Sequence, residues 1–429
     1  MEGQLSLFDG STLFMFDKPI RLIELFAGYG SQHLALSALG VPFESWKICE
    51  WAVKSIQAYK DLHFSNDNFD YSTQLSDSQI IDFLAEKGIS ANYTEPMTKQ
   101  QIQRLQADKR RVIYNNIFAT HNLVNIQQAK GIDLDIKDTD KFTYLLTYSF
   151  PCQDLSSVGK RKGMAKDGNT RSGMLWQVER LLKDCNDSLP QMLLMENVPE
   201  VVGTKNIHFF ADWLSFLDNL GYTSKWVILN AKDFGIPQNR KRCFMLSWLG
   251  DYYYDFPEKV QMKSFVDFLD FDEGYIIKPE NLTQTQKNYI KIANETLSKT
   301  IRSEGLKSRD RHSWSVYSVD LRQSEKFIKN GSLYAENFSK TICAQHLLSY
   351  TIDGRVYFDY SPKECFRLMG VTDKQFETIK KNQSKTSLYH LAGDSIVVAV
   401  LVAILGQCVE GFDFDKYLNN FYEQIKEQR

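Results

Sequence analysis

Paired cysteines are missing from this chain. Its seven cysteines are scattered along 429 residues, are odd in number and nowhere form a Cys-x-x-Cys pair. Structural zinc sites commonly use Cys-x-x-Cys pairs, and disulfide frameworks use an even number of cysteines, so this number and spacing argue against either as the basis of the fold. We therefore expect no metal.

Long apolar runs are missing as well. No run reaches the length that a helix needs to span a bilayer. The segment Met1 to Phe16 lacks the basic region, apolar core and cleavage site of a secretion signal. We expect a protein of the bacterial or host-cell cytoplasm, with no membrane partner.

The chain also lacks an excess of charge of either sign. The chain carries 51 Lys and Arg against 53 Asp and Glu, a net charge of −2. A nucleic-acid partner would therefore have to be held by local basic patches. Candidate patches are Lys160-Arg161-Lys162, Arg240-Lys241-Arg242, Arg302 and 307–312. Each of them, taken singly, is typical of a solvated surface.

Apolar residues, in contrast, are plentiful enough for a large core. They make up 43% of the chain, and aromatic residues make up 13%. A chain of this length with this composition predicts two domains.

A strand, a glycine turn and a helix open the first domain. Arg21–Phe26 predicts a buried strand, Ala27–Gly30 predicts a turn that needs the backbone freedom of glycine, and Ser31–Leu39 has helical spacing. This succession is typical of a nucleotide pocket. A tight turn without any ligand is the alternative, because a Gly-x-Gly sequence alone is weak evidence.

An acidic residue follows at the distance that a ribose contact requires. The predicted strand Trp46–Cys49 ends at Glu50, about twenty residues after the glycine turn, and Trp51 offers a face for adenine. The position where a dinucleotide-binding turn has its third glycine is His33, and no Gly-Lys-Ser/Thr sequence lies nearby. Both observations disfavour the binding of a pyrophosphate group. S-adenosylmethionine, an adenosine without phosphates, fits better.

Two further apolar runs each end in a reactive side chain. Phe142–Tyr148 leads through Ser149-Phe150-Pro151 to Cys152, and Gln191–Met195 leads to Glu196. The carboxyl ends of neighbouring parallel strands meet at one edge of a sheet, so a nucleophile and an acid can share one cleft there. A buried apolar cysteine and a helix-capping glutamate would explain each residue alone but not the pair.

Seven short motifs follow one another along the chain. They are Phe26-Ala27-Gly28-Tyr29-Gly30, Glu50-Trp51, Pro151-Cys152-Gln153, Glu196-Asn197-Val198, Gln238-Asn239-Arg240-Lys241-Arg242, Arg367-Leu368-Met369-Gly370 and Gly393-Asp394-Ser395. Their order resembles that of the DNA (cytosine-5)-methyltransferase family, in its bacterial or phage type. The resemblance runs from residue 20 to about residue 405, with insertions.

The resemblance implies a covalent mechanism for methyl transfer to cytosine. The Cys152 thiolate adds to C6 of the base, and the activated C5 then attacks the sulfonium methyl group. Glu196 protonates or hydrogen-bonds N3 and so neutralises the charge that develops on the ring. Arg242 is implied to face O2 of the cytosine, and Arg240 to brace the catalytic loop or the backbone.

The same resemblance implies a set of contacts to S-adenosylmethionine. The expected cofactor-binding residues are Phe26, Gly28, Gly30, Glu50, Trp51, Asn125, Pro151, Met174, Asp394 and Ser395. Two of these depart from the family pattern. Asp394 stands where the family has asparagine, and Asn125 in Val124-Asn125-Ile126 is the best placement for the usual aspartate of a Gly-Asp-Ile motif.

DNA contacts are expected mainly in two regions, with Gln153 and Gln238 in addition. The segment 154–173 has the composition of a mobile loop, which in the family closes over DNA behind an extruded base. The stretch 302–317 is basic and aromatic and lies where the family keeps its base-reading domain. The expected DNA-binding residues are Gln153, Ser156, Lys160, Arg161, Gln238, Arg309 and Arg311.

The predicted architecture is an α/β, Rossmann-like methyltransferase sheet with a smaller target recognition domain. The catalytic domain covers 1–250 and is completed by 388–429, with an insertion at about 65–120, and the recognition domain with its return segment covers 251–387. We expect a monomer that methylates double-stranded DNA in a restriction-modification system or protects phage or mobile-element DNA. The alternatives are an RNA cytosine-5 methyltransferase and a catalytically silent DNA-binding regulator.

Overall fold

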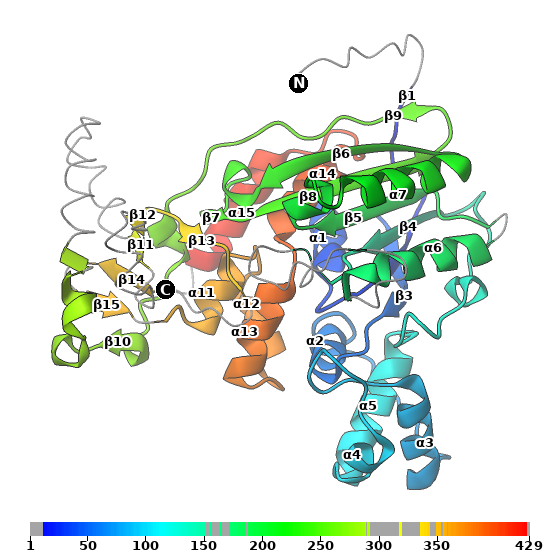
Figure 1. The fold of residues 1–429 in the computed structure, drawn as a ribbon, viewed down its shortest axis with the longest axis horizontal. Helices are drawn as coiled ribbons and strands as arrows, with labels where there is room; N and C mark the ends of the chain where they lie inside the picture. Colours follow the sequence, from blue (N-terminus) through cyan, green and yellow to red (C-terminus); the bar gives the residue numbers. More distant parts are fainter. Residues whose placement is uncertain are drawn as a thin grey trace. The chain divides into compact units, whose positions relative to one another are not determined.

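A computed structural model describes the parts of the chain considered below. They are residues 12–151, 155, 164, 171–185, 188–288, 290–291, 317–319, 335–343, 349–352, 355–357 and 359–426. The chain forms two compact units (Figure 1). Unit 1 comprises 1–229, 241–258 and 401–414, and unit 2 comprises 230–240, 259–400 and 415–429.

Unit 1 is built on a six-stranded sheet with the strand order β3-β2-β4-β5-β8-β6. Its strands are β2 (Ile20–Leu25), β3 (Phe43–Cys49), β4 (Thr143–Tyr148), β5 (Met192–Asn197), β6 (Tyr222–Asn230) and β8 (Lys241–Leu249). β2 pairs in parallel with β3 and β4, and β4 pairs in parallel with β5, whereas β8 runs antiparallel to β5. The α/β fold predicted from the sequence is confirmed.

The central strands are apolar because they are covered. Every residue of β2, β4 and β5 is buried, as expected of parallel strands with both faces packed. One face carries Leu146, Leu193 and Met245, which share a core with residues of α6 (Leu175–Asp184) and α7 (Ile207–Asn219). This packing fixes the carboxyl ends of β4 and β5, where the reactive residues were predicted.

The remaining helices of unit 1 include the predicted insertion. α1 spans Ser31–Leu39, as predicted from its spacing, and α2 spans Val53–His63. The insertion forms α3 (Asp77–Lys87), α4 (Lys99–Gln103) and α5 (Ala107–Ala119). Ile80, Leu84 and Ile113 share a core with Ile56 of α2. A two-residue strand pair, β1 (Thr12–Leu13) with β9 (Tyr252–Tyr253), completes this unit.

Unit 2 contains a five-stranded sheet and a set of helices. The sheet has the order β10-β15-β14-β11-β12, and β13 pairs with β7. The strands are β7 (Gln238–Asn239), β10 (Ile276–Ile277), β11 (Tyr317–Val319), β12 (Ala335–Glu336), β13 (Ser339–Lys340), β14 (Ser349–Ile352) and β15 (Arg355–Tyr357). The helices are α11 (Pro362–Arg367), α12 (Asp373–Lys380), α13 (Lys385–Asp394) and α15 (Phe414–Lys426).

The C-terminal region differs in one respect from the sequence prediction. The Gly393-Asp394-Ser395 motif lies at the end of a helix, since α13 ends at Asp394 and the next helix, α14, spans Val398–Gly406. In the described part of the chain, the stretch Lys385–Gly406 is also long and apolar enough to cross a membrane by length and composition, contrary to expectation. Within the protein, 89% of the most apolar window of this stretch is buried. A helix in the core of a globular protein has the same length, composition and burial.

Candidate active site

The register of three strands places the predicted acid, Glu196, among polar neighbours. Tyr148 of β4 lies opposite Met195 of β5 in the parallel ladder, so the next residues, Ser149 and Glu196, are neighbours. On the other side, Glu196 lies opposite Phe244 of β8. Arg242 is two residues from Phe244 and therefore faces the same side of the sheet as Glu196.

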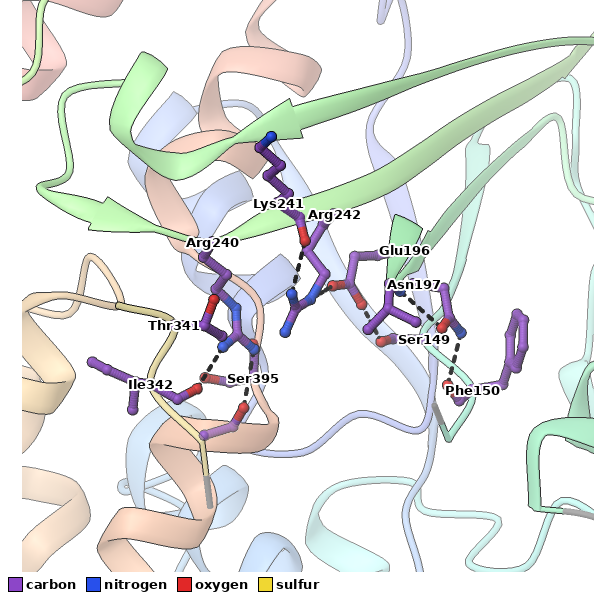
Figure 2. Close-up of polar contacts among 12 residues, drawn as sticks. Ser149, Phe150, Glu196, Asn197, Arg240, Lys241, Arg242, Thr341, Ile342 and Ser395 are labelled. Carbon is purple, nitrogen blue, oxygen red and sulfur yellow. Dashed lines mark hydrogen bonds and ion pairs between the residues drawn. The ribbon is translucent and has the colours of Figure 1, made fainter. Parts of the chain in front are cut away.

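Both oxygens of the Glu196 carboxylate are engaged. Arg242 Nε lies 3.0 Å from Oε1, and Ser149 Oγ donates to Oε2 at 2.5 Å. Figure 2 shows the carboxylate between these two side chains. Glu196 is only 5% exposed, so the carboxylate is held in one orientation by groups that are themselves fixed by the sheet.

The residue after Glu196 holds the segment that leads to Cys152. Asn197 Nδ2 donates to the carbonyl oxygen of Phe150 at 2.9 Å, and Asn197 Oδ1 accepts the backbone N–H of Val198 at 2.9 Å (Figure 2). The Glu-Asn-Val sequence therefore combines an acid with an amide that anchors the end of the neighbouring strand. Sequence reasoning gave Asn197 no role of its own.

Several predicted residues lie outside the described residues. These are Cys152, Gln153, Ser156, Lys160, Arg161, Arg309 and Arg311. The described cysteines bear on the nucleophile indirectly. Burial raises the pKa of the thiols of Cys49, Cys185, Cys243, Cys365 and Cys408. For Cys243 the pKa reaches about 12, with the Glu196 charge as a second cause. Thiols kept protonated in this way are poor nucleophiles.

The glycine turn has the backbone shape that the sequence predicted. Gly28 and Gly30 have φ of 57° and 85°, and Phe26 also adopts a positive φ of 60°. A Cβ at position 30 would collide with the ring of His63, so only glycine fits there. At position 28 a Cβ would meet nothing within 4 Å, so the backbone there is open to the approach of a ligand.

Glu50 is oriented by the turn that it faces. Its Oε2 accepts the backbone N–H of Gly28 at 2.9 Å, and its Oε1 accepts that of Ala52 at 2.7 Å. The side chain is 9% exposed. A carboxylate fixed in this way at a strand end beside a glycine turn suits a ribose diol, so the residues present fit S-adenosylmethionine.

Asn122, which sequence reasoning missed, links Glu50 to the segment after the insertion. Its Oδ1 accepts the backbone N–H groups of Glu50 and Val124 at 3.0 and 2.8 Å, and its Nδ2 donates to the Glu50 carbonyl at 2.9 Å. Val124 has a φ of 67°, which is strained for a β-branched residue. In the placement predicted from the sequence, it stands where the family's Gly-Asp-Ile motif has its glycine.

The other predicted cofactor residues of unit 1 are partly buried. Asn125 Oδ1 accepts the backbone N–H of Gln127 at 3.0 Å. Trp51 packs against the helical core of the insertion, and Met174 packs against the main core at the start of α6. Pro151 ends the described part of the strand connection. Each has some exposed surface, as a ligand contact requires.

A buried polar network lies behind the glycine turn. Glu24 of β2 accepts hydrogen bonds from the Tyr59 hydroxyl and, at 3.4 Å, from the backbone N–H of His33. The rings of His33 and His63 lie 3.8 Å apart, and His63 Nε2 lies 2.8 Å from the Tyr29 carbonyl. Burial raises the pKa of Glu24 to about 8 and lowers that of His33 to about 4. A neutral network therefore supports the turn.

In unit 2, Arg240 binds backbone carbonyl groups. Its guanidinium donates to Ile342 O at 2.7 Å, Gly393 O at 3.0 Å and Ser395 O at 2.7 Å (Figure 2). It is 4% exposed. Arg240 therefore holds the Gly-Asp-Ser segment to the strand connection at Ile342.

Gln238 does not have the exposure that a DNA contact needs. It is fully buried. Its Nε2 donates to Leu368 O at 2.8 Å, and its Oε1 accepts the backbone N–H of Ile342 at 3.1 Å. The prediction of a DNA contact from Gln238 is corrected accordingly, because both ends of its amide are used inside unit 2.

Asp394, the departure from the family's asparagine, has a histidine partner. Asp394 Oδ2 lies 2.9 Å from His390 Nδ1, one helical turn earlier on α13. The hydrogen bond to Asp394 raises the pKa of His390. The carboxylate that this difference adds therefore has a hydrogen-bond partner within the same helix.

Comparison with known proteins identifies the family. Residues 88–410 match the family described as C-5 cytosine-specific DNA methylase. The chain belongs to this family. Type II methyltransferase M2.ScrFI of Lactococcus lactis subsp. cremoris is 32% identical over 391 residues, which cover 90% of this chain and 98% of that protein. Orphan methyltransferase M.SssI of Spiroplasma monobiae is 38% identical over 242 residues, or 55% of this chain and 61% of that protein.

Among solved structures, the chain is similar to the S. pombe Dnmt2 methyltransferase. The TM-score is 0.52 at 15% identity, with 92% of this chain and all of that chain covered. This likeness shows the fold alone. The family match confirms the resemblance predicted from the motifs: the protein is a DNA cytosine-5 methyltransferase of bacterial type. The two alternatives, an RNA enzyme and a silent regulator, are not favoured.

Proposed function

We propose that this DNA cytosine-5 methyltransferase acts on a cytosine flipped out of a specific duplex sequence, through a covalent Cys152 adduct. The observation that carries the proposal is the fixed carboxylate of Glu196 at the end of β5, beside the strand that leads to Cys152. Flipping is required because C5 and C6 are inaccessible to a thiol within the base stack.

The protein's own groups activate the base. The Cys152 sulfur forms a bond to C6, and Glu196 gives or shares a proton at N3, so the ring electrons move to C5. Arg242 holds Glu196 and, by the resemblance, reaches O2. After C5 has taken the methyl group, the C5 proton passes to water, the C6–S bond breaks and the Cys152 thiolate leaves. N3 returns its proton to Glu196, and the ring regains its aromaticity.

Several groups of unit 1 are proposed to hold S-adenosylmethionine, which supplies an electrophilic methyl group on a sulfonium. Glu50 would accept hydrogen bonds from the ribose hydroxyls, and Gly28 would allow close approach of the ligand to the backbone. Phe26 and Trp51 would pack against adenine, and Asn125, Pro151 and Met174 would complete the contacts. The contributions of Asp394 and Ser395 remain predictions.

The biological setting and the DNA contacts are also proposals. M2.ScrFI is a type II methyltransferase and M.SssI an orphan methyltransferase, so we propose DNA protection, with or without a partner nuclease, by a cytoplasmic monomer. Base reading is proposed for the recognition segment around Arg309 and Arg311. Phosphate contacts are proposed for the basic segment that follows Cys152.

The direct test is methylation of unmethylated duplex DNA with tritiated S-adenosylmethionine, followed by sequencing after bisulfite conversion. The proposal predicts label in 5-methylcytosine at one repeated sequence. Label on RNA alone, or on no nucleic acid, would contradict it.

A further inference from the structure

The catalytic acid is held from both sides by neighbouring strands, and the two holders differ in chemistry. Arg242 from β8 contacts Oε1 at 3.0 Å, and Ser149 at the end of β4 contacts Oε2 at 2.5 Å. A guanidinium can only donate hydrogen bonds, whereas a hydroxyl can donate or accept. Ser149 is therefore the holder that can serve a protonated and an ionised carboxyl group alike.

The strand register makes the contact of Ser149 with Glu196 a consequence of the fold. The pairing of Tyr148 with Met195 is the last rung of the parallel ladder, and Ser149 and Glu196 follow it directly. Asn197 then ties down the next carbonyl, that of Phe150, at 2.9 Å. The Ser149 backbone thus lies between two fixed points, and its side chain needs no rearrangement to reach the acid.

We propose that Ser149 is a positioning residue for catalysis. It keeps the Glu196 carboxyl group aimed at N3 of the target base while the proton moves between them. This inference rests on the proposed role of Glu196. In the described part of the chain, Arg242 of β8 is the charged side chain in contact with Glu196; Cys243 lies opposite Asn197 and points to the other face of the sheet.

The substitution Ser149→Ala tests the inference. The expected result is a loss of about tenfold in kcat, the size of one hydrogen bond of about 1.4 kcal/mol. KM for DNA and for S-adenosylmethionine should stay within about twofold, because the substrates do not need this hydroxyl to bind. Ser149→Thr, which keeps the hydroxyl, should restore most of the loss.

A matched control is Ser224→Ala in the same sheet. Ser224 Oγ lies 2.8 Å from Ser247 Oγ, so this variant also loses one serine hydrogen bond between strands. We expect its kcat to equal that of the parent. Equal melting temperatures of the two alanine variants would show that a loss of activity at Ser149 does not come from unfolding.

The substitution Glu196→Gln separates this inference from the proposed function. If Glu196→Gln is inactive in multiple turnover and Ser149→Ala keeps full kcat, the role of Ser149 is refuted and that of Glu196 stands. If Glu196→Gln keeps full kcat, the proposed function of Glu196 fails first. In single-turnover methylation, Ser149→Ala should add little to the defect of Glu196→Gln, because a glutamine at 196 has no proton to give to N3 and Ser149 then has no proton transfer to assist; fully additive losses would overturn the inference.

Discussion

Glu50 and Asn122 exchange hydrogen bonds although a helical insertion and its connections separate them along the chain. The Asn122 amide accepts the Glu50 N–H at 3.0 Å and donates to the Glu50 carbonyl at 2.9 Å. The Asn122 amide therefore satisfies both the N–H and the carbonyl group of the Glu50 backbone. These groups follow β3, which is the edge strand of the sheet and, in the described part of the chain, has no strand on its other side. The proposed ribose acceptor thus depends on a residue beyond the insertion.

The substitution Asn122→Ala should weaken cofactor binding. Removal of the amide leaves buried backbone groups of Glu50 unpaired, which costs about 1–3 kcal/mol and loosens the carboxylate. We expect the Kd for S-adenosylmethionine to rise about tenfold or more, measured by isothermal titration calorimetry. Asn115→Ala on α5, which loses a hydrogen bond of 2.9 Å to Asp70, is the matched control and should bind like the parent. An unchanged Kd for Asn122→Ala would separate Asn122 from the cofactor site.

The substitution Arg242→Lys should reduce kcat at least about tenfold. A lysine ammonium cannot reproduce the planar guanidinium that holds Glu196 Oε1 at 3.0 Å. The Kd for S-adenosylmethionine should not change, because the loss concerns the target base. Lys241→Ala is the neighbouring control, since Lys241 is exposed. Steady-state methylation of DNA by the two variants makes the comparison, and equal activity would contradict the role of Arg242.

The substitution Glu24→Gln should change how stability depends on pH. Burial raises the Glu24 pKa from 4.5 to about 8 in the folded protein. The neutral acid therefore stabilises the fold fully below pH 4.5, and this contribution is lost as the pH rises to about 8. A glutamine side chain stays neutral at every pH, and its amide can still hydrogen-bond the Tyr59 hydroxyl and the His33 backbone N–H.

Urea unfolding at pH 6.5 and 8 checks this prediction. In that window the parent should lose about 2 kcal/mol more stability than Glu24→Gln. The partly buried His33 and His63 have lowered pKa values in the folded protein, so they titrate there mainly below this window. If the free energy of unfolding fell by the same amount in both proteins between pH 6.5 and pH 8, Glu24 would not be held neutral in the folded protein.

Unit 2 contains a buried ion pair whose disruption should be costly. Arg367 donates to both carboxylate oxygens of Asp373 at 2.7 and 2.6 Å, and both side chains are 1% exposed. The substitution Asp373→Asn leaves a buried charge without its counter-ion and should cost about 3 kcal/mol or more, seen as a lower melting temperature. Glu377→Gln, in the exposed pair with Lys380 at 3.5 Å, should change little. If Asp373→Asn melted at the same temperature as the parent, the ion pair would not contribute to stability as proposed.

The features that sequence predicts best are those set by short-range pattern. Helical spacing gave α1 at Ser31–Leu39, and the apolar run before Ser149 gave β4, because both depend on neighbours along the chain. The need for glycine at position 30 was also predictable in part. Two causes require glycine there: the positive φ of the turn, and the His63 ring, which occupies the space that a Cβ would need. Only the turn could be inferred from the sequence.

The features that sequence did not predict depend on partners far along the chain. Ser149 was interpreted only as part of the run that leads to Cys152, although the register of β4 with β5 places it on Glu196. Gln238 lies in a basic motif, yet it is buried against Leu368, 130 residues away. The His390 and Asp394 pair is an exception, since its spacing of four residues on a helix was a signal that could have been used.

The covalent step is tested most directly with duplex DNA that carries 5-fluorocytosine at the methylated position. A fluorine at C5 cannot leave as a proton does, so the thiol cannot be eliminated and the adduct should persist. The account predicts a complex that survives denaturing electrophoresis and whose linked peptide, identified by mass spectrometry, contains Cys152, with no such complex from Cys152→Ser. Methylation of ordinary DNA without any trapped complex, or a link to a different cysteine, would contradict it.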